Sequence, residues 1–117
     1  MNKQVYIASA ARTPVGSFQG ALSSLSAPEL GAHSIRASIE RASVQDSQID
    51  EVIMGNVVSA GLKQAPARQA MRNAGLPDSC GATTVNKVCG SGMKAIMLAT
   101  DLIKADSGTT IIAGGME

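Results

Sequence analysis

The sequence predicts an α/β fold in which helices pack on a parallel or mixed sheet. Short apolar runs typical of strands alternate along the chain with longer stretches of helical periodicity. Aromatic side chains are nearly absent, with one Tyr, one Phe and no Trp among 117 residues, so the core must consist of small and medium aliphatic residues. Such side chains suit close packing of helices on a sheet, and the length suffices for one small domain.

The first half of the chain is expected to contain two strands and a helix. Residues 5–10 (VYIASA) begin with β-branched and aromatic residues and predict a strand. Residues 11–26 are rich in Gly, Ser and Pro and predict a long loop. Ser26 and Glu29 have the spacing of a capping box, which predicts that a helix begins there. The apolar run at residues 51–58 (EVIMGNVV) predicts the second strand.

The second half continues the alternation of helix and strand. Residues 64–77 predict a short helix, because a proline stands near its start and Gly-Leu-Pro follows its end. Residues 81–88 (GATTVNKV) predict a third strand that runs directly into Cys89. A long helix from residue 91 to 105 follows, and residues 109–115 (TTIIAGG) predict a fourth strand.

The helix expected at residues 91–105 is apolar nearly all round. Its charged residues Lys94, Asp101 and Lys104 lie on one narrow stripe. A helix with this pattern belongs inside a protein. A domain of this size is small to surround it, so we expect a partner or a further part of the protein to cover it.

Composition excludes several classes of function. The formal net charge is +1 with both signs mixed along the chain, so no basic stripe indicates nucleic acid or an anionic membrane surface. No apolar run approaches the roughly 20 residues of a membrane helix, and the apolar patch at residues 5–10 is too short for a signal peptide. Two cysteines, Cys80 and Cys89, are too few for a disulfide scaffold. We therefore expect a reducing compartment, the cytoplasm.

Cys89 is the residue whose surroundings suit chemistry. A strand that ends at Cys89 and a helix that begins near Ser91 place the sulfur at a helix N-terminus, where backbone N–H groups carry partial positive charge. Gly90 and Gly92 leave the approach to the sulfur open. The same N–H groups could bind the oxyanion that forms when a carbonyl is attacked.

Position alone does not make this cysteine a nucleophile. A helix end supplies roughly 0.3–2 kcal/mol, so full activation of a thiol would need a base as well. The single histidine, His33, lies off the apolar stripe of the first helix and is expected to be solvated. A free cysteine is more often an inert buried residue, and this is the interpretation for Cys80. Two Cys and one His form no metal-binding spacing, and we expect neither a metal nor a cofactor site.

The segment "NKVCGSGMKA", residues 86–95, closely resembles the sequence around the acyl-accepting cysteine of thiolases, particularly the biosynthetic type. The resemblance extends along the chain through "ASAARTPVGSFQGALS", "VIMGNVVSAGLKQAPARQAMRNAGLP" and "IIAGGME". Several motifs in the order of the family carry more weight than a single Cys-Gly pair. The resemblance implies a layered α-β-α half-domain with a mixed, mostly parallel sheet and a buried helix that begins just after Cys89.

The resemblance also implies a function, acetyl-CoA C-acetyltransfer. Cys89 would take an acetyl group from one acetyl-CoA and release CoA, and its backbone N–H would form part of the oxyanion hole. A second acetyl-CoA, deprotonated at its α-carbon, would attack the acyl-enzyme to give acetoacetyl-CoA, and thiolysis is the reverse reaction. The implied partners are acetyl-CoA and CoA as substrates and further copies of the chain in a dimer or tetramer, without nucleic acid, membrane or cofactor.

The resemblance covers only part of the family's sequence. The activating histidine of a Gly-His-Pro segment, the second cysteine of a Cys-x-Gly-Gly segment and an Asn-Glu-Ala-Phe segment belong to the C-terminal half of thiolases. Residues 1–117 would thus be an incomplete N-terminal domain without the CoA-binding loop region, and we expect this chain alone to be inactive. Two alternatives stay open: a β-ketoacyl synthase-type condensing enzyme, and a non-catalytic module for association.

Overall fold

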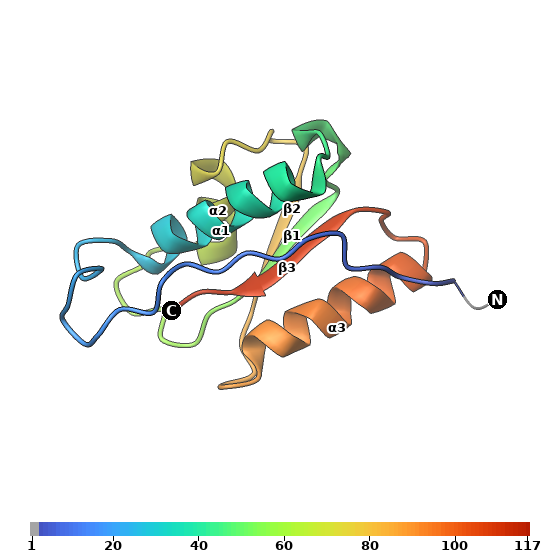
Figure 1. The fold of residues 1–117 in the computed structure, drawn as a ribbon. Helices are drawn as coiled ribbons and strands as arrows, with labels where there is room; N and C mark the ends of the chain where they lie inside the picture. Colours follow the sequence, from blue (N-terminus) through green and yellow to red (C-terminus); the bar gives the residue numbers. More distant parts are fainter. Residues whose placement is uncertain (1–2) are drawn as a thin grey trace.

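The computed structural model describes residues 3–117 and contains a parallel three-stranded sheet with helices on both faces (Figure 1). The strand order is β2-β1-β3, with β1 pairing in parallel with both neighbours. The strands are β1 (Glu51–Gly55), β2 (Gly81–Val85) and β3 (Ile111–Gly115). The α/β fold is therefore confirmed. Every strand pair within the described residues is parallel, so an antiparallel component is not found among them.

The sheet separates two hydrophobic clusters. Helices α1 (Ala27–Ala42) and α2 (Pro66–Asn73) cover one face, and α3 (Ser91–Lys104) covers the other (Figure 1). Side chains of successive strand residues point to opposite faces. Val52 and Met54 accordingly belong to the cluster under α1 and α2, whereas Ile53 packs with the alanines of α3. Alternate side chains of β1 therefore pack against the helices on the two faces of the sheet, as expected for an α-β-α arrangement.

Helix α1 begins at the residue that the sequence indicates. Ser26 is the N-cap, and its Oγ accepts the backbone N–H of Glu29 at 3.3 Å. The Glu29 carboxylate in turn accepts the backbone N–H of Ser26 at 2.6 Å. These bonds to the charged form lower the pKa of Glu29. The predicted capping box is confirmed, and it fixes the point at which the long loop enters the helix.

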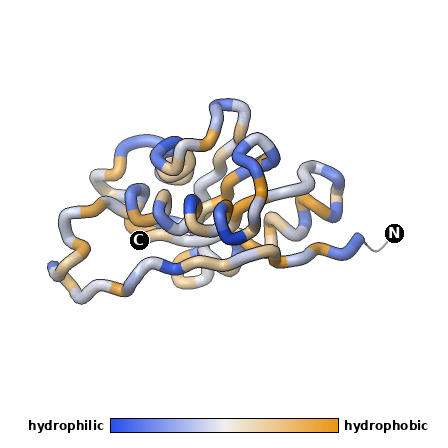
Figure 2. The backbone as a smooth tube through the Cα atoms, turned by 45° about the horizontal axis from the view of Figure 1, so that its top comes forward, coloured by the Kyte–Doolittle hydropathy of each residue, from blue (hydrophilic) through white to orange (hydrophobic). Residues whose placement is uncertain are grey.

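The strand expected at residues 5–10 is not formed. These residues are extended but pair with no strand among residues 3–117. Tyr6 and Ile7 are exposed, and the hydrophobic residues of the segment lie along the outside of the molecule (Figure 2). Side-chain contacts hold the segment instead: the Ser9 hydroxyl donates to the Ser38 carbonyl at 2.7 Å. Local β-propensity was present, but a strand also requires a partner edge within hydrogen-bonding distance.

The other predicted strands are shorter than expected. The chain leaves the sheet at Gly55 rather than at residue 58, and at Val85 rather than at residue 88. Strand β3 starts at Ile111, because Thr109 and Thr110 donate their backbone N–H groups to the Asp50 carboxylate. The truncated ends of β1 and β2 release short loops at one edge of the sheet.

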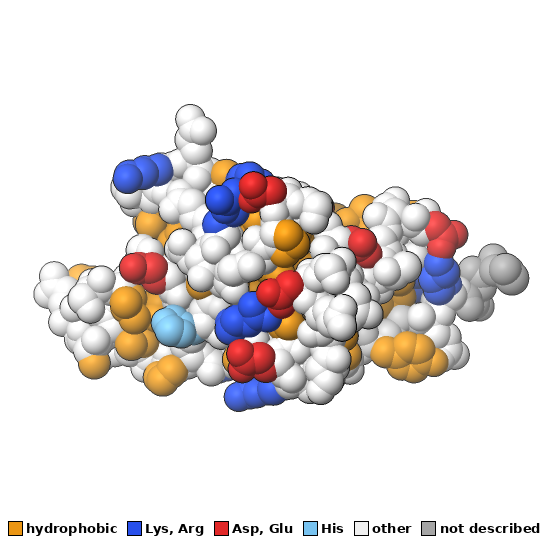
Figure 3. All heavy atoms as spheres, turned by 90° about the horizontal axis from the view of Figure 1, so that it is seen from above, with side chains coloured by type: hydrophobic (Ala, Val, Ile, Leu, Met, Phe, Trp, Pro, Cys, Tyr) orange, Lys and Arg blue, Asp and Glu red, His pale blue; other side chains and the backbone are white. Residues whose placement is uncertain are grey.

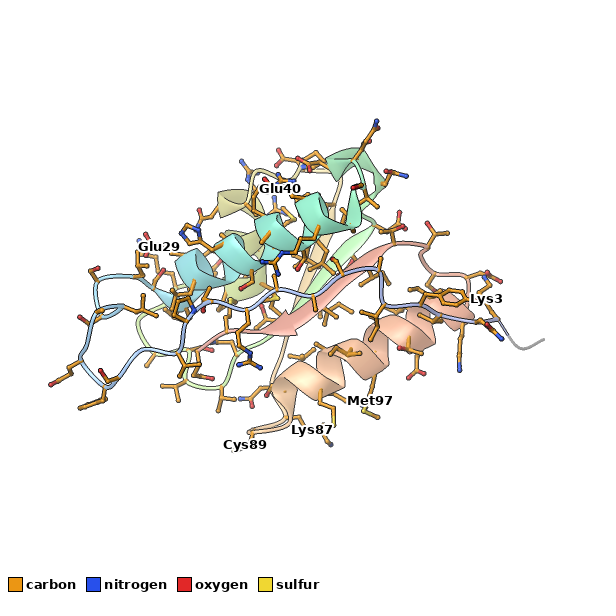
Figure 4. All side chains as sticks on the ribbon, viewed as in Figure 1. Lys3, Glu29, Glu40, Lys87, Cys89 and Met97 are labelled. Atoms are coloured by element: carbon orange, nitrogen blue, oxygen red, sulfur yellow. The ribbon has the colours of Figure 1, made fainter. Side chains whose placement is uncertain are left out.

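Helix α3 is covered on one side only within the described residues. Ala95 and Ala99 are buried against the sheet, while Met93, Ile96 and Met97 are exposed. Met97 projects away from the sheet (Figure 4). The predicted start of the helix is confirmed, and its outer face is the uncovered apolar surface that the sequence pattern indicates.

Within the described residues, the surface over α1 and α2 has no large patch of only positive or only negative side chains (Figure 3). Basic and acidic side chains are interspersed on this face (Figure 3). Arg36, for example, donates to Asp46 at 2.5 Å, and this pairing lowers the pKa of the carboxyl and raises that of the guanidinium. Among residues 3–117, none of the helices has the length and apolar character needed to cross a membrane.

Candidate active site

The candidate site lies where the carboxyl ends of the three strands meet. Parallel strands bring their ends to the same edge of a sheet, the usual position of ligand sites in open α/β sheets. Here the loop after β1, the loop after β2 and the two residues after β3 come together around a surface hollow of about 410 Å³. Helix α3 begins at this same edge. Segments far apart in the sequence thus form one site.

Cys89 lies at the outer end of the loop that leads into α3 and is exposed (Figure 4). Gly90 is the N-cap, and the first intrahelical bond is donated by the Lys94 N–H to the Gly90 carbonyl at 2.8 Å. The N–H groups of Gly92 and Met93 precede that bond and have no acceptor within the helix. The position of Cys89 at the helix N-terminus is therefore as the sequence predicts.

The route of the chain into Cys89 differs from the expectation. Instead of continuing the strand, residues 87–90 form a turn in which the Gly90 N–H donates to the Lys87 carbonyl at 3.0 Å. Val88 has φ 48°, in the left-handed region that β-branched residues rarely adopt. Its backbone N–H is accepted by the Asn86 side-chain oxygen at 2.9 Å. Asn can replace a backbone partner in this way, which favours a turn over continued strand pairing.

The hollow beside Cys89 is lined mostly by apolar side chains and by one carboxylate. Val57, Val58 and Val88 supply exposed or half-buried aliphatic side chains. Glu117 also lines the hollow, and its carboxylate accepts the backbone N–H groups of Val57 at 3.1 Å and Val58 at 2.7 Å. An apolar wall with few polar groups suits a small acyl group better than a charged one.

Three glycines allow α3 to approach the sheet closely. A Cβ at Gly55 would lie 2.6 Å from the Cβ of Ser91 and 2.7 Å from its carbonyl carbon. On the neighbouring strand, a Cβ at Gly115 would lie 3.3 Å from the Cα of Gly92. The start of α3 therefore rests on the backbone of β1 and β3, and Cys89 is positioned by strands other than the one that precedes it.

Two residues of the site were not predicted. Asn56 is buried, and its side-chain N–H donates to the Met116 carbonyl at 3.0 Å while its oxygen accepts the Ser59 hydroxyl. Together with Glu117, it ties the loop after β1 to the chain after β3. The available signal was a polar residue directly after an apolar strand, which often marks a functional loop.

The remaining candidates lie elsewhere. Cys80 is buried directly before β2, and burial, with the nearby carboxylates Glu51 and Asp50, raises the pKa of its thiol. Both cysteines are free. His33 is exposed on α1, the helix layer on the opposite face of the sheet from α3 (Figure 1). No group of three metal-binding side chains occurs in the part of the chain that the structure describes.

An accessible cysteine at a helix start, beside an apolar hollow on an α/β layer, defines a domain suited to covalent acyl chemistry. Comparison with known proteins identifies the family. The chain belongs to the thiolase family, because the family model for the thiolase N-terminal domain matches residues 5–117.

Relatives agree with this membership. The chain is 55% identical over 114 residues to the mitochondrial acetyl-CoA acetyltransferase of Xenopus tropicalis, and 56% identical over 113 residues to the acetyl-CoA acetyltransferase of Cupriavidus necator. It is 47% identical over 114 residues to acetyl-CoA acetyltransferase IA of Candida tropicalis. Each match covers 97% of this chain but only 27%, 29% and 28% of the respective relative. The chain thus spans less than a third of the length of these proteins.

Proposed function

We propose that the full-length protein containing this chain is an acetyl-CoA C-acetyltransferase with Cys89 as its acyl acceptor. The observation that carries the proposal is the exposed Cys89 at the start of α3, beside the hollow, in a chain matched over 97% of its length to acetyl-CoA acetyltransferases. Coenzyme A thioesters are the proposed substrates, and no separate cofactor is needed for this chemistry.

The proposed reaction begins at the sulfur. The Cys89 thiolate attacks the thioester carbonyl of acetyl-CoA, and the C–S bond to CoA breaks as CoA leaves as its thiolate. The backbone N–H of Cys89, together with N–H groups at the start of α3, would stabilise the oxyanion. A second acetyl-CoA then loses an α-proton, its carbanion attacks the acetyl-enzyme, and the Cys89 thiolate leaves. The product is acetoacetyl-CoA.

Residues 3–117 account for the first of these steps better than for the second. The nucleophile and the helix start belong to this chain, whereas its single histidine lies on the other face of the sheet. The groups that move the protons are proposed to come from the part of the relatives' length that this chain does not match. Such groups typically contribute about 10²–10⁴-fold each, so carbon–carbon bond formation should depend on them.

Mass mapping of the acylated residue tests the proposal. After brief exposure of the full-length protein to acetyl-CoA, the acetyl group should be found on Cys89, and Cys89→Ala should abolish both acylation and turnover. Cys80→Ala is the matched control and should keep both, because Cys80 is buried away from the hollow. Acetyl label found mainly on Cys80, or turnover that survives Cys89→Ala, would contradict the assignment.

Assembly and location belong to the same proposal. The exposed apolar face of α3 supports a protein whose copies or further segments cover this helix, and a dimer or tetramer is proposed. It is equally the observation that favours the second candidate, a non-catalytic association module, which the turnover assay separates from an enzyme. A cytoplasmic location stays a prediction, since the Xenopus relative carries the word mitochondrial in its name.

A further inference from the structure

The turn before Cys89 contains a backbone conformation that needs outside support. Val88 has φ 48°, and a β-branched residue is a genuine outlier in this region. Its side chain is 65% exposed, so packing of that side chain does not hold the conformation. Conformations of this kind persist only where the surroundings over-determine them, and they gather at functional sites. Because Val88 immediately precedes Cys89, its backbone angles set the direction in which the chain enters the cysteine.

Ser91 supplies the support from inside. Its side chain is buried, with 5% of the residue exposed. The Ser91 Oγ accepts the backbone N–H of Lys87 at 2.8 Å and donates to the carbonyl of Val88 at 2.6 Å. One hydroxyl therefore joins the two ends of the Lys87–Val88 segment. The Asn86 side chain holds the Val88 N–H at 2.9 Å from the exposed side of the turn.

Ser91 is placed to brace the turn rather than the helix. Gly90 is the N-cap of α3, and no side chain caps the helix. The Ser91 hydroxyl points back to the preceding residues instead of forward to the N–H groups of the first turn. Ser91 lies so close to Gly55 that a Cβ built at position 55 would stand only 2.6 Å from the Ser91 Cβ, so the start of α3 rests directly against the β1 backbone. Ser91 therefore connects the turn that contains Val88 to the end of β1.

We propose that Ser91 is a positioning residue for acyl transfer: by holding Val88 in the left-handed conformation it fixes Cys89 in its reactive place. The inference rests on the proposed function, in which Cys89 accepts the acetyl group. Ser91 acts through the turn and is not proposed to touch the substrate.

The test compares two hydroxyl deletions on the same helix of the full-length protein. Ser91→Ala removes the brace without adding volume, and Thr100→Ala is the matched control, since the Thr100 hydroxyl donates only to the Ile96 carbonyl one turn away at 2.9 Å. Ser91→Ala should lower kcat for acetyl transfer about tenfold, the loss expected for two partly buried hydrogen bonds, with KM for acetyl-CoA changed less than about twofold. Thr100→Ala should leave both constants within about twofold.

A rescue experiment distinguishes positioning from a general loss of stability. Asn tolerates the left-handed region far better than Val, so the Val88→Asn background lowers the need for the brace. In that background Ser91→Ala should lower kcat only about two- to threefold, measured against the Val88→Asn single variant. If Ser91→Ala does not fold, Asn86→Ala, which removes the other partner of Val88, should lower kcat about threefold without a matching change in KM.

The outcomes separate the positioning role of Ser91 from the proposed function of Cys89. If Cys89→Ala abolishes turnover but Ser91→Ala behaves like Thr100→Ala, the positioning role is wrong and the proposed function stands. An equal loss in both Val88 backgrounds would likewise overturn the route through the turn. If Cys89→Ala keeps full turnover, the proposed function fails and this inference fails with it.

Discussion

The contact between Gly55 and the start of α3 gives the strongest prediction. In Gly55→Ala the new Cβ would lie 2.6 Å from the Ser91 Cβ, 2.7 Å from the Ser91 carbonyl carbon and 2.9 Å from the Gly92 nitrogen. Carbon atoms in contact are normally about 3.5–4.0 Å apart. Two of the three atoms belong to the helix backbone, so no change of rotamer can relieve the overlap. The start of α3, and Cys89 with it, must move away from β1 by about 1 Å.

The size of the effect follows from that displacement. Overpacking of a well-packed site typically costs about 1–3 kcal/mol, which should lower the melting temperature by about 2–8 °C per kcal/mol, depending on domain size. A catalytic group misplaced by about 1 Å can lose about 100-fold in rate. We therefore expect Gly55→Ala to lose far more acetyl-transfer activity than its change in stability would explain.

The assay measures kcat and melting temperature of the full-length protein beside a matched control. Gly114→Ala changes a glycine of the adjacent strand, where the nearest atom to the new Cβ is the flexible Met54 sulfur at 3.5 Å, an ordinary contact. This control should keep kcat within about twofold. If Gly55→Ala and Gly114→Ala prove equal in kcat and melting temperature, α3 can leave β1 without cost and the reasoning is refuted.

Two further predictions concern stability and association. Asp50→Asn should destabilise the full-length protein by about 1 kcal/mol at neutral pH in urea unfolding, since the exposed carboxylate accepts the N–H groups of Thr109 and Thr110. These bonds lower the pKa of Asp50, so the difference between the two proteins should be full above the ordinary pKa of about 3.9 and vanish as pH falls through the lowered value; a constant difference would contradict it. Residues 1–117 expressed alone should self-associate in light scattering through the exposed face of α3, and Met97→Lys should reduce this association. Equal scattering by both forms would contradict the role of that face.

Features fixed by neighbouring residues could be predicted from the sequence. The start of α1 follows from Ser26 and Glu29, which satisfy each other's backbone across three positions. The start of α3 beside Cys89 follows from the glycines and the helical pattern after it. Both depend on contacts within one turn of chain, which is the range that a local pattern describes.

Features that depend on residues far away in the sequence could not be predicted from it. Residues 5–10 have the composition of a strand, yet pairing depends on an edge that no local pattern specifies. Val88 is a different case, because the residues that hold it in a left-handed turn, Asn86 and Ser91, are near in sequence, and its strong β-propensity masked their bonds. The sequence motif also singles out Gly90, next to the cysteine, as a residue that leaves space. In the structure a Cβ at Gly90 would make only one ordinary contact, with the Lys87 carbonyl oxygen at 3.5 Å.

The same distinction explains how the candidate nucleophile is held. Cys89 follows β2 in the chain, but the close contacts at the start of α3 are made by Gly55 at the end of β1 and by Gly115 at the end of β3. The residues directly after these two strands are joined as well, because the side-chain N–H of the buried Asn56 donates to the Met116 carbonyl. The cysteine therefore reaches its place only when all three strands are assembled in register. A sulfur positioned in this way is coupled to the integrity of the whole sheet, so substitutions of Gly55 and Gly115, which contact the start of α3, should act on acyl transfer as strongly as substitutions in the turn beside Cys89 itself.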